Sequence, residues 1–134
     1  MLLKKFKSNK FLFFLFFLAI VISCKKEKKF LDNAEGTYLG KYSFDNKKDI
    51  GDVKIKLTDV SDEKMNFENT FLASGIVVSE PLVNTFDKKK LILNFKSDNS
   101  NYQISGYVKE DSLVFRTFEK ITSDTVYFKA LRVE

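Results

Sequence analysis

The chain offers few side chains that could carry out chemistry, and one of them stands alone. Cys24 is the single cysteine among 134 residues, and there is no histidine. Nucleophilic triads need an activating base, normally histidine, and the G-x-S-x-G turn of serine hydrolases is also absent. The five glycines are scattered singly, so the sequence contains no glycine-rich phosphate loop. We therefore expect the protein to have no enzymatic activity and no cofactor.

Carboxylates are the remaining candidates for metal binding. Asp45, Asp49 and Asp52 lie close together in one polar segment, but their spacing does not match the EF-hand calcium loop. We interpret them as solvated loop charge. Because histidine is absent and the one thiol lies far from these carboxylates, the sequence predicts no metal site.

Cys24 ends a leader that has three parts. Four lysines precede a block of twelve apolar residues (11–22), and Ser23 and Cys24 close it. This order of basic, apolar and small residues is typical of a secretory signal peptide. A membrane-spanning helix needs about 20 apolar residues, so the block is too short to serve as an uncleaved spanning anchor.

The four residues Val21-Ile22-Ser23-Cys24 resemble the lipobox of bacterial lipoproteins. The resemblance implies that residues 1–23 are a signal peptide cleaved before Cys24, and that Cys24 then carries acyl chains such as palmitate. Each buried CH₂ contributes about 0.8 kcal/mol, and two chains give stable membrane anchoring. The alternative is an ordinary signal peptide with a chance cysteine near its cleavage site.

The positive charge of the chain is confined to its beginning. The formal net charge is +5, yet residues 30–134 contain 15 basic and 17 acidic residues. A slightly acidic domain argues against nucleic acid as a partner, because nucleic-acid binders present a basic face. We expect residues 24–35 to form a lipidated, basic tether beside anionic headgroups, and residues 36–134 to form one domain.

From Gly36 onward, apolar residues recur at every second position, as in half-buried strands. Val53, Ile55 and Leu57 alternate with polar residues, for example. The alternating segments are 36–44, 52–59, 64–68, 74–80, 90–96, 101–109, 112–118 and 125–133. Polar turn clusters separate them.

The pattern predicts an all-β fold, an antiparallel meander of about eight short strands. We expect it to close into a small barrel, because consecutive hairpins remove open edges without long crossovers. A β-sandwich is the alternative. Pairing is ambiguous in 69–90, where Pro81 disfavours a central strand and the chain forms either one long bent strand or two short ones.

Gly36-Thr37-Tyr38 resembles the G-x-W that opens calycin barrels such as lipocalins, with Tyr in place of Trp. Arg132, in the last segment, matches the arginine that those families place over this aromatic residue. The resemblance implies that Tyr38 and Arg132 form a pair at one end of a closed barrel, held by a cation–π contact. Small lipid-anchored lipocalin-like proteins of Bacteroidota share this layout.

Two short motifs resemble O-glycosylation acceptors of exported Bacteroidota proteins. They are Asp111-Ser112-Leu113 and Asp124-Thr125-Val126, in which Ser112 and Thr125 would carry the sugar. The alternative is turn chemistry, because Asp and Ser favour turns through their side-chain hydrogen bonds.

Many aromatic residues share the inward phase of the predicted strands, among them Tyr42, Phe67, Phe115 and Phe128. They either line a pocket for an apolar ligand or fill the interior of a small barrel, and the shortness of the chain favours filling.

Two functions fit these observations. The first is a lipid-anchored, non-catalytic binding module for an envelope component or an apolar ligand. The second is a protein-interaction part, such as an inhibitor, an immunity factor or a subunit of an envelope machine.

The residue directly after Cys24 is Lys25, not the aspartate that retains enterobacterial lipoproteins in the inner membrane. We therefore expect the outer membrane and its periplasmic face, with the cell surface as the alternative.

Overall fold

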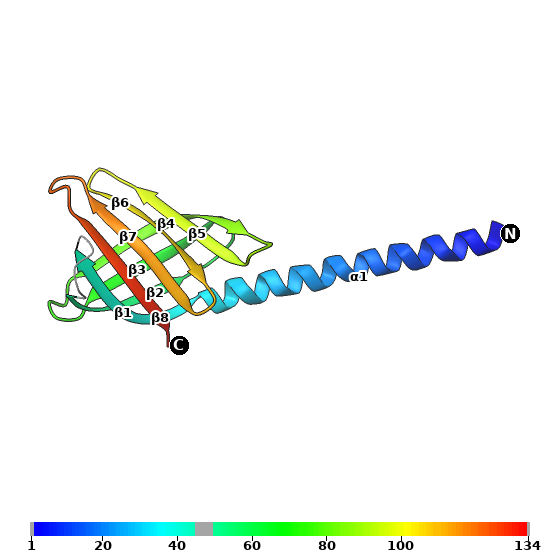
Figure 1. Cartoon of the computed structure of the whole chain (residues 1–134), viewed down its shortest axis with the longest axis horizontal. Helices are drawn as coiled ribbons and strands as arrows, with labels where there is room; N and C mark the ends of the chain where they lie inside the picture. Colours follow the sequence, from blue (N-terminus) through cyan, green and yellow to red (C-terminus); the bar gives the residue numbers. More distant parts are fainter. Residues whose placement is uncertain (1, 45–49, 134) are drawn as a thin grey trace.

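The computed structural model describes residues 2–44 and 50–133 as one helix followed by eight strands (Figure 1). Helix α1 spans Leu2–Ala34. The strands are β1 (Gly36–Phe44), β2 (Gly51–Thr58), β3 (Lys64–Phe71), β4 (Val77–Asp87), β5 (Ile92–Asp98), β6 (Tyr102–Lys109), β7 (Ser112–Glu119) and β8 (Thr125–Arg132).

The eight strands form a closed barrel in which every strand pairs with its neighbour in sequence. All the pairings are antiparallel, including the closing one between β1 and β8. The predicted antiparallel meander and its closure into a barrel are therefore confirmed, and the sandwich alternative is wrong. The closing ladder runs from Tyr38↔Arg132 to Phe44↔Val126.

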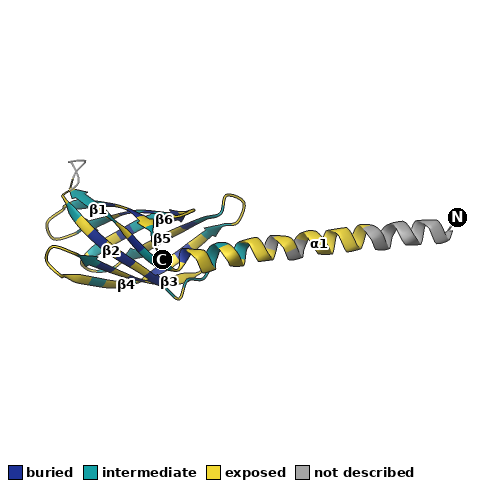
Figure 2. Ribbon diagram, turned by 90° about the horizontal axis from the view of Figure 1, so that it is seen from below, coloured by how far each residue is buried: buried dark blue, intermediate teal, exposed yellow. Residues whose placement is uncertain are grey.

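Burial alternates along β2 and β3 as the period of two predicts (Figure 2). In β2, Val53, Ile55 and Leu57 are fully buried between exposed lysines. The barrel interior is thus the hydrophobic core, and its largest fully buried side chains are Tyr38, Ile55, Leu57, Met65, Leu82, Leu93, Leu113, Val53 and Val108.

Gly40 lies at a point where the closing strands approach closely. A β-carbon built on Gly40 would lie 2.0 Å from the carbonyl oxygen of Lys129 and 2.5 Å from the Cα atom of Ala130. Real β-carbons do not approach backbone atoms so closely, so a side chain at position 40 would force β1 away from β8. Glycine is required here by the tight curvature of a small barrel.

The ambiguous region 69–90 forms one long strand, the eleven-residue β4, after the turn that ends β3. Pro81 lies within β4 and pairs with Asn66 of β3. The backbone N–H of Asn84 points toward the β3 side, where it donates to the Glu63 carbonyl. Because N–H groups alternate in direction along a strand, the nitrogen of Pro81 faces β5. The β4–β5 ladder begins only at Val83↔Lys96, so the proline removes no ladder hydrogen bond.

The last turn of α1 covers one end of the barrel, which we call the closed end. Ala34 is 1% exposed, and Phe30 stacks on Phe86 of β4 with ring centroids 5.4 Å apart. The Tyr38 hydroxyl donates to the Ala34 carbonyl oxygen at 2.7 Å, which satisfies a carbonyl at the end of the helix. Packing of the domain therefore begins before Gly36, within the segment expected to be a tether.

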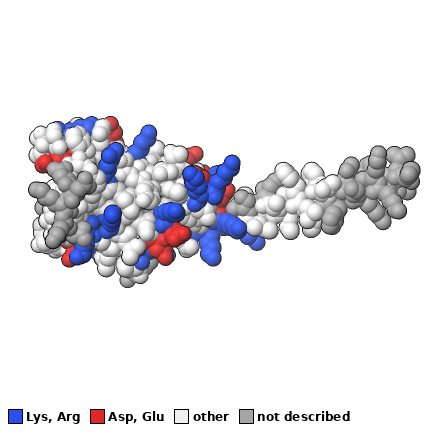
Figure 3. Space-filling model, in the orientation of Figure 1, with Lys and Arg blue, Asp and Glu red and all other residues white. Residues whose placement is uncertain are grey.

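Basic side chains surround the closed end (Figure 3). They come from α1 and from the turn between β4 and β5, and all of them are exposed. We call this group the basic collar: Lys25, Lys26, Lys28, Lys29, Lys88, Lys89 and Lys90. Lys88 Nζ lies 3.9 Å from a carboxylate oxygen of Glu27. Within the described part of the chain, no helix is both long and apolar enough to cross a bilayer.

Candidate functional site

The end of the barrel opposite α1, the open end, contains a cavity of about 250 Å³ that we call the mouth cavity. Residues of β1, β3, β4, β6, β7 and β8 line it, together with Ile76 of the β3–β4 turn. They are Phe44, Phe67, Asn69, Phe71, Ile76, Val78, Tyr102, Ile104, Thr117, Glu119, Val126 and Phe128. The lining is mainly apolar and aromatic, which is the composition of small-molecule sites.

Stacked and edge-on aromatic rings separate the mouth cavity from the filled, closed half of the barrel. Phe128 stacks on Phe115 with centroids 4.3 Å apart, and Phe67 meets Phe115 edge-on at 5.2 Å. Phe71 contacts both Tyr42 and Phe128 edge-on. The inward aromatic residues thus have two roles. Those toward α1 fill the interior, as the shortness of the chain favoured, whereas those toward the open end line a cavity.

Asn69 is the buried polar residue of the lining, whereas Thr117 and Glu119 are only half-buried. Asn69 occupies the inward phase of β3 after Met65 and Phe67, and it is 3% exposed. Its Oδ1 atom has no hydrogen-bond partner among the described residues. Leaving a buried polar atom without a partner costs about 1–3 kcal/mol. Asn69 was not predicted as a site residue, although a polar residue in an apolar phase is a visible signal in the sequence.

Exposed aliphatic side chains form an apolar rim around the mouth cavity, and three different loops supply them. The rim consists of Ile50, Leu72, Ile76 and Ile121, which are 50%, 51%, 59% and 79% exposed. Ile50 precedes β2, Leu72 and Ile76 belong to the β3–β4 turn, and Ile121 belongs to the β7–β8 turn. An apolar cavity therefore opens onto an apolar rim at the end farthest from α1.

The wall of the barrel has a seam beside the mouth cavity. The β4–β5 ladder covers only Val83–Asp87 of β4, so the first half of β4 pairs with β3 alone. Glu80 bridges this seam with its side chain. Its carboxylate accepts hydrogen bonds from Ser97 Oγ at 3.2 Å and from Asn99 Nδ2. A side-chain contact here replaces the backbone ladder.

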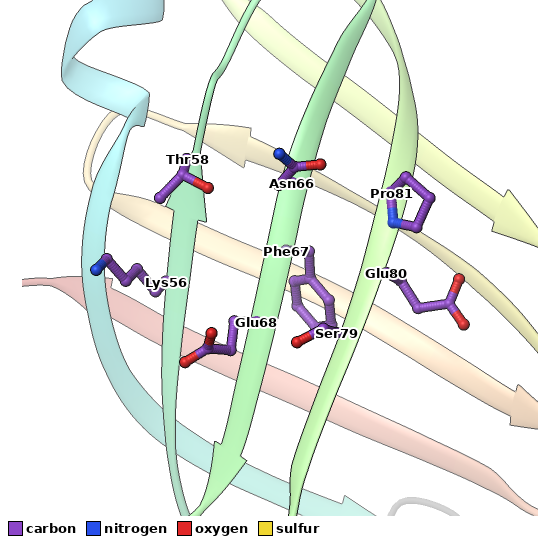
Figure 4. Close-up of a pocket in the computed structure, with 8 residues that line it drawn as sticks. All are labelled: Lys56, Thr58, Asn66, Phe67, Glu68, Ser79, Glu80 and Pro81. Atoms are coloured by element: carbon purple, nitrogen blue, oxygen red, sulfur yellow. The ribbon is translucent and has the colours of Figure 1, made fainter.

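A second depression, of about 290 Å³, lies over the outer face of β2, β3 and β4 (Figure 4). Lys56, Thr58, Asn66 and Glu68 give it a polar character, and Glu80 points away from them toward the seam. None of the unpartnered buried atoms found in the described part of the chain belongs to these residues. The mouth cavity is therefore the stronger candidate site.

Tyr38 and Arg132 lie opposite each other in the closing ladder, as the calycin resemblance implied. Tyr38 is fully buried, and burial raises the pKa of its hydroxyl to about 12, although the positive charge of Arg132 opposes the shift. Arg132 is half-buried, and its Nε atom has no partner among the described residues. The cation–π contact stays a prediction.

The other predicted site residues lie outside the mouth cavity. Cys24 is exposed on α1, ten residues before its end. Ser112 and Thr125 are the half-buried first residues of β7 and β8. Asp45 and Asp49 lie outside the described residues, and across residues 2–44 and 50–133 no acidic or cysteine side chains form a group of three placed to hold a metal ion.

The chain matches no protein-family model, and no curated protein matches it significantly. The resemblances to lipoproteins and calycins therefore depend on the residues quoted for them.

Proposed function

We propose that the protein is a lipid-anchored lipoprotein of the outer membrane whose barrel binds a small apolar ligand in the mouth cavity. The observation that carries this proposal is the mouth cavity itself, an apolar space of about 250 Å³ within an otherwise filled barrel. For comparison, a dry apolar cavity of about 150 Å³ in another protein takes up benzene. The binding is non-catalytic.

The arrangement of the two barrel ends supports the proposed anchor. Cys24 precedes Ala34 by ten residues of α1, which corresponds to about 15 Å of helix. Acyl chains on Cys24 would hold the closed end toward the membrane, and the basic collar there suits anionic headgroups. The mouth cavity then opens away from the anchoring membrane, and we propose that it opens into the periplasm.

Binding of a hydrocarbon probe tests the proposed ligand site. We expect purified protein to bind one molecule of butylbenzene, measured by calorimetry. Val78 lines the mouth cavity, so Val78→Trp should fill it and abolish binding. Val83 lies on the same strand with its side chain 59% exposed, and Val83→Trp serves as the matched control that retains binding. Unchanged binding to Val78→Trp would refute the site.

A protein partner is the second candidate, and the apolar rim favours it. Soluble domains rarely gather exposed aliphatic side chains at one end without a binding role. Ile121 belongs to the rim but does not line the mouth cavity. Ile121→Glu should therefore leave butylbenzene binding intact, whereas it should abolish a complex that forms through the rim.

A further inference from the structure

The mouth cavity contains a polar group that packing alone does not explain. Asn69 lines the cavity and is only 3% exposed, and its Oδ1 atom has no partner among the described residues. In the ladders on either side of β3, Asn69 pairs with Ile55 of β2 and with Val78 of β4. Leucine at this position would pack among these apolar side chains without leaving a polar atom unsatisfied.

The other buried asparagine gives a direct contrast. Asn84 of β4 also faces inward, is 6% exposed and likewise leaves its Oδ1 atom without a partner among the described residues, but its Nδ2 atom donates to the Ser61 carbonyl oxygen at 2.9 Å. That bond ties β4 to the β2–β3 loop at the closed end. Asn84 therefore has a structural partner and lies outside the mouth cavity, whereas no side-chain hydrogen bond of Asn69 is found in the described part of the chain.

We infer that Asn69 recognises the buried end of the ligand, which is a neutral molecule with an apolar body and a hydroxyl or amide group. This inference rests on the proposed function. A primary amide offers both an acceptor and two donors, so it can pair with a hydroxyl or with another amide. A pure hydrocarbon would leave Oδ1 without a partner and lose this hydrogen bond.

The charges around the cavity disfavour an anionic ligand. No lysine or arginine is among the lining residues identified in the described chain, and the one ionisable acid that lines it is Glu119. Glu80 lies close by, at the seam. A carboxylate moved into this space would lose its hydration without gaining a cation from the described lining. Alcohols and amides should consequently bind better than the corresponding carboxylates.

A matched set of probes tests the inference: butylbenzene, 4-phenylbutan-1-ol and 4-phenylbutanoate at pH 7, where the acid is ionised. Dissociation constants are measured by calorimetry for the wild type, Asn69→Leu and the control Asn84→Leu. The ratio compared is the affinity for the alcohol divided by the affinity for butylbenzene. We expect Asn69→Leu to lower this ratio roughly tenfold. Asn84→Leu should leave the ratio unchanged, and the wild type should bind the carboxylate most weakly.

A measurement on the wild type keeps the test independent of how well the variants fold. The side-chain NH₂ resonances of Asn69 should move when 4-phenylbutan-1-ol saturates the site and move less with butylbenzene. Resonances that stay fixed with the alcohol, or a ratio that Asn69→Leu does not change, would overturn the inference and leave the proposed function standing. If none of the three probes bound to the wild type, the proposed function itself would fall.

Discussion

Tyr38 of β1 lies directly opposite Arg132 of β8 in the ladder that closes the barrel, and the Tyr38 hydroxyl donates to the last carbonyl of α1. One buried residue therefore joins three elements: its backbone pairs the first strand with the last, and its side chain bonds the helix. The cluster holds the closed end at the point from which the proposed anchor departs. It connects stability of the barrel with the position of the helix.

Removal of the Tyr38 hydroxyl should weaken this junction. Tyr38→Phe keeps the ring but leaves the Ala34 carbonyl without its partner, so we expect a loss of about 1 kcal/mol in the free energy of unfolding. Urea denaturation measures the loss. Tyr107 is 40% exposed on the outer surface, and Tyr107→Phe should change stability by less than half as much. Equal effects of the two substitutions would contradict the junction.

The burial of Tyr38 should also make the stability of the protein depend on pH. Burial raises the pKa of Tyr38 to about 12 from an ordinary value of 10.0. The unfolded chain therefore releases this proton first, so the contribution of Tyr38 is complete below pH 10 and is lost as the pH rises to 12. The loss amounts to as much as about 3 kcal/mol. Between pH 9 and pH 12, Tyr38→Phe should lose less stability than the wild type, as chemical denaturation at each pH would measure.

The closure of the barrel was predictable from the sequence because consecutive hairpins remove open edges once the first and last strands pair. Tyr38 and Arg132 lie in the inward phases of their strands. Because side chains alternate between the two faces of a strand, the pairing of the strands determines which residues point inward. The packing of Phe30 on Phe86 was not predictable. It depends on the angle at which α1 leaves β1, and no local period encodes that angle.

The mouth cavity was only partly predictable for a related reason. The inward phase identifies Phe67, Phe71 and Phe128 as interior residues, but empty volume depends on distances across the barrel. Phe67, Phe71 and Phe128 line the space and also meet other rings in stacked or edge-on pairs, so the phase of a ring does not tell whether the volume beside it is filled. Asn69 shares the inward phase with its apolar neighbours, so attention to that single residue would have indicated a site.

Asn69→Leu should stabilise the protein in the absence of ligand. The substitution removes an unsatisfied buried oxygen and keeps the same branched side-chain shape beside an open cavity, so we expect a gain of about 1 kcal/mol. Asn84→Leu also removes an unpartnered oxygen but breaks the bond to the Ser61 carbonyl, so it should not stabilise the protein. Thermal unfolding of the two variants makes the comparison. A lower melting temperature for Asn69→Leu would mean that Asn69 has a structural partner.

The proposed anchor depends on one atom, the Sγ atom of Cys24. Cys24→Ala should abolish incorporation of radioactive palmitate and leave the domain unattached to membranes or retained as its precursor. Cys24→Ser serves as the control for side-chain size and should also fail to label. Undiminished labelling of either variant would place the acyl chains elsewhere or exclude them.

The seam beside the mouth cavity should open when its bridge is removed. Glu80 holds Ser97 and Asn99 by side-chain hydrogen bonds where the β4–β5 backbone ladder is absent. Glu80→Ala removes both bonds, and we expect faster hydrogen exchange of amides in the first half of β4 and at the end of β5. Exchange in β1 and β8 should stay unchanged, because the closing ladder lies elsewhere in the barrel.

Glu68→Ala serves as the control. Glu68 faces outward on β3 and forms no ion pair among those found in the described residues. If both variants gave the wild-type exchange pattern, the seam would be held by packing alone. Faster exchange confined to Glu80→Ala would assign the closure of the wall beside the cavity to this carboxylate.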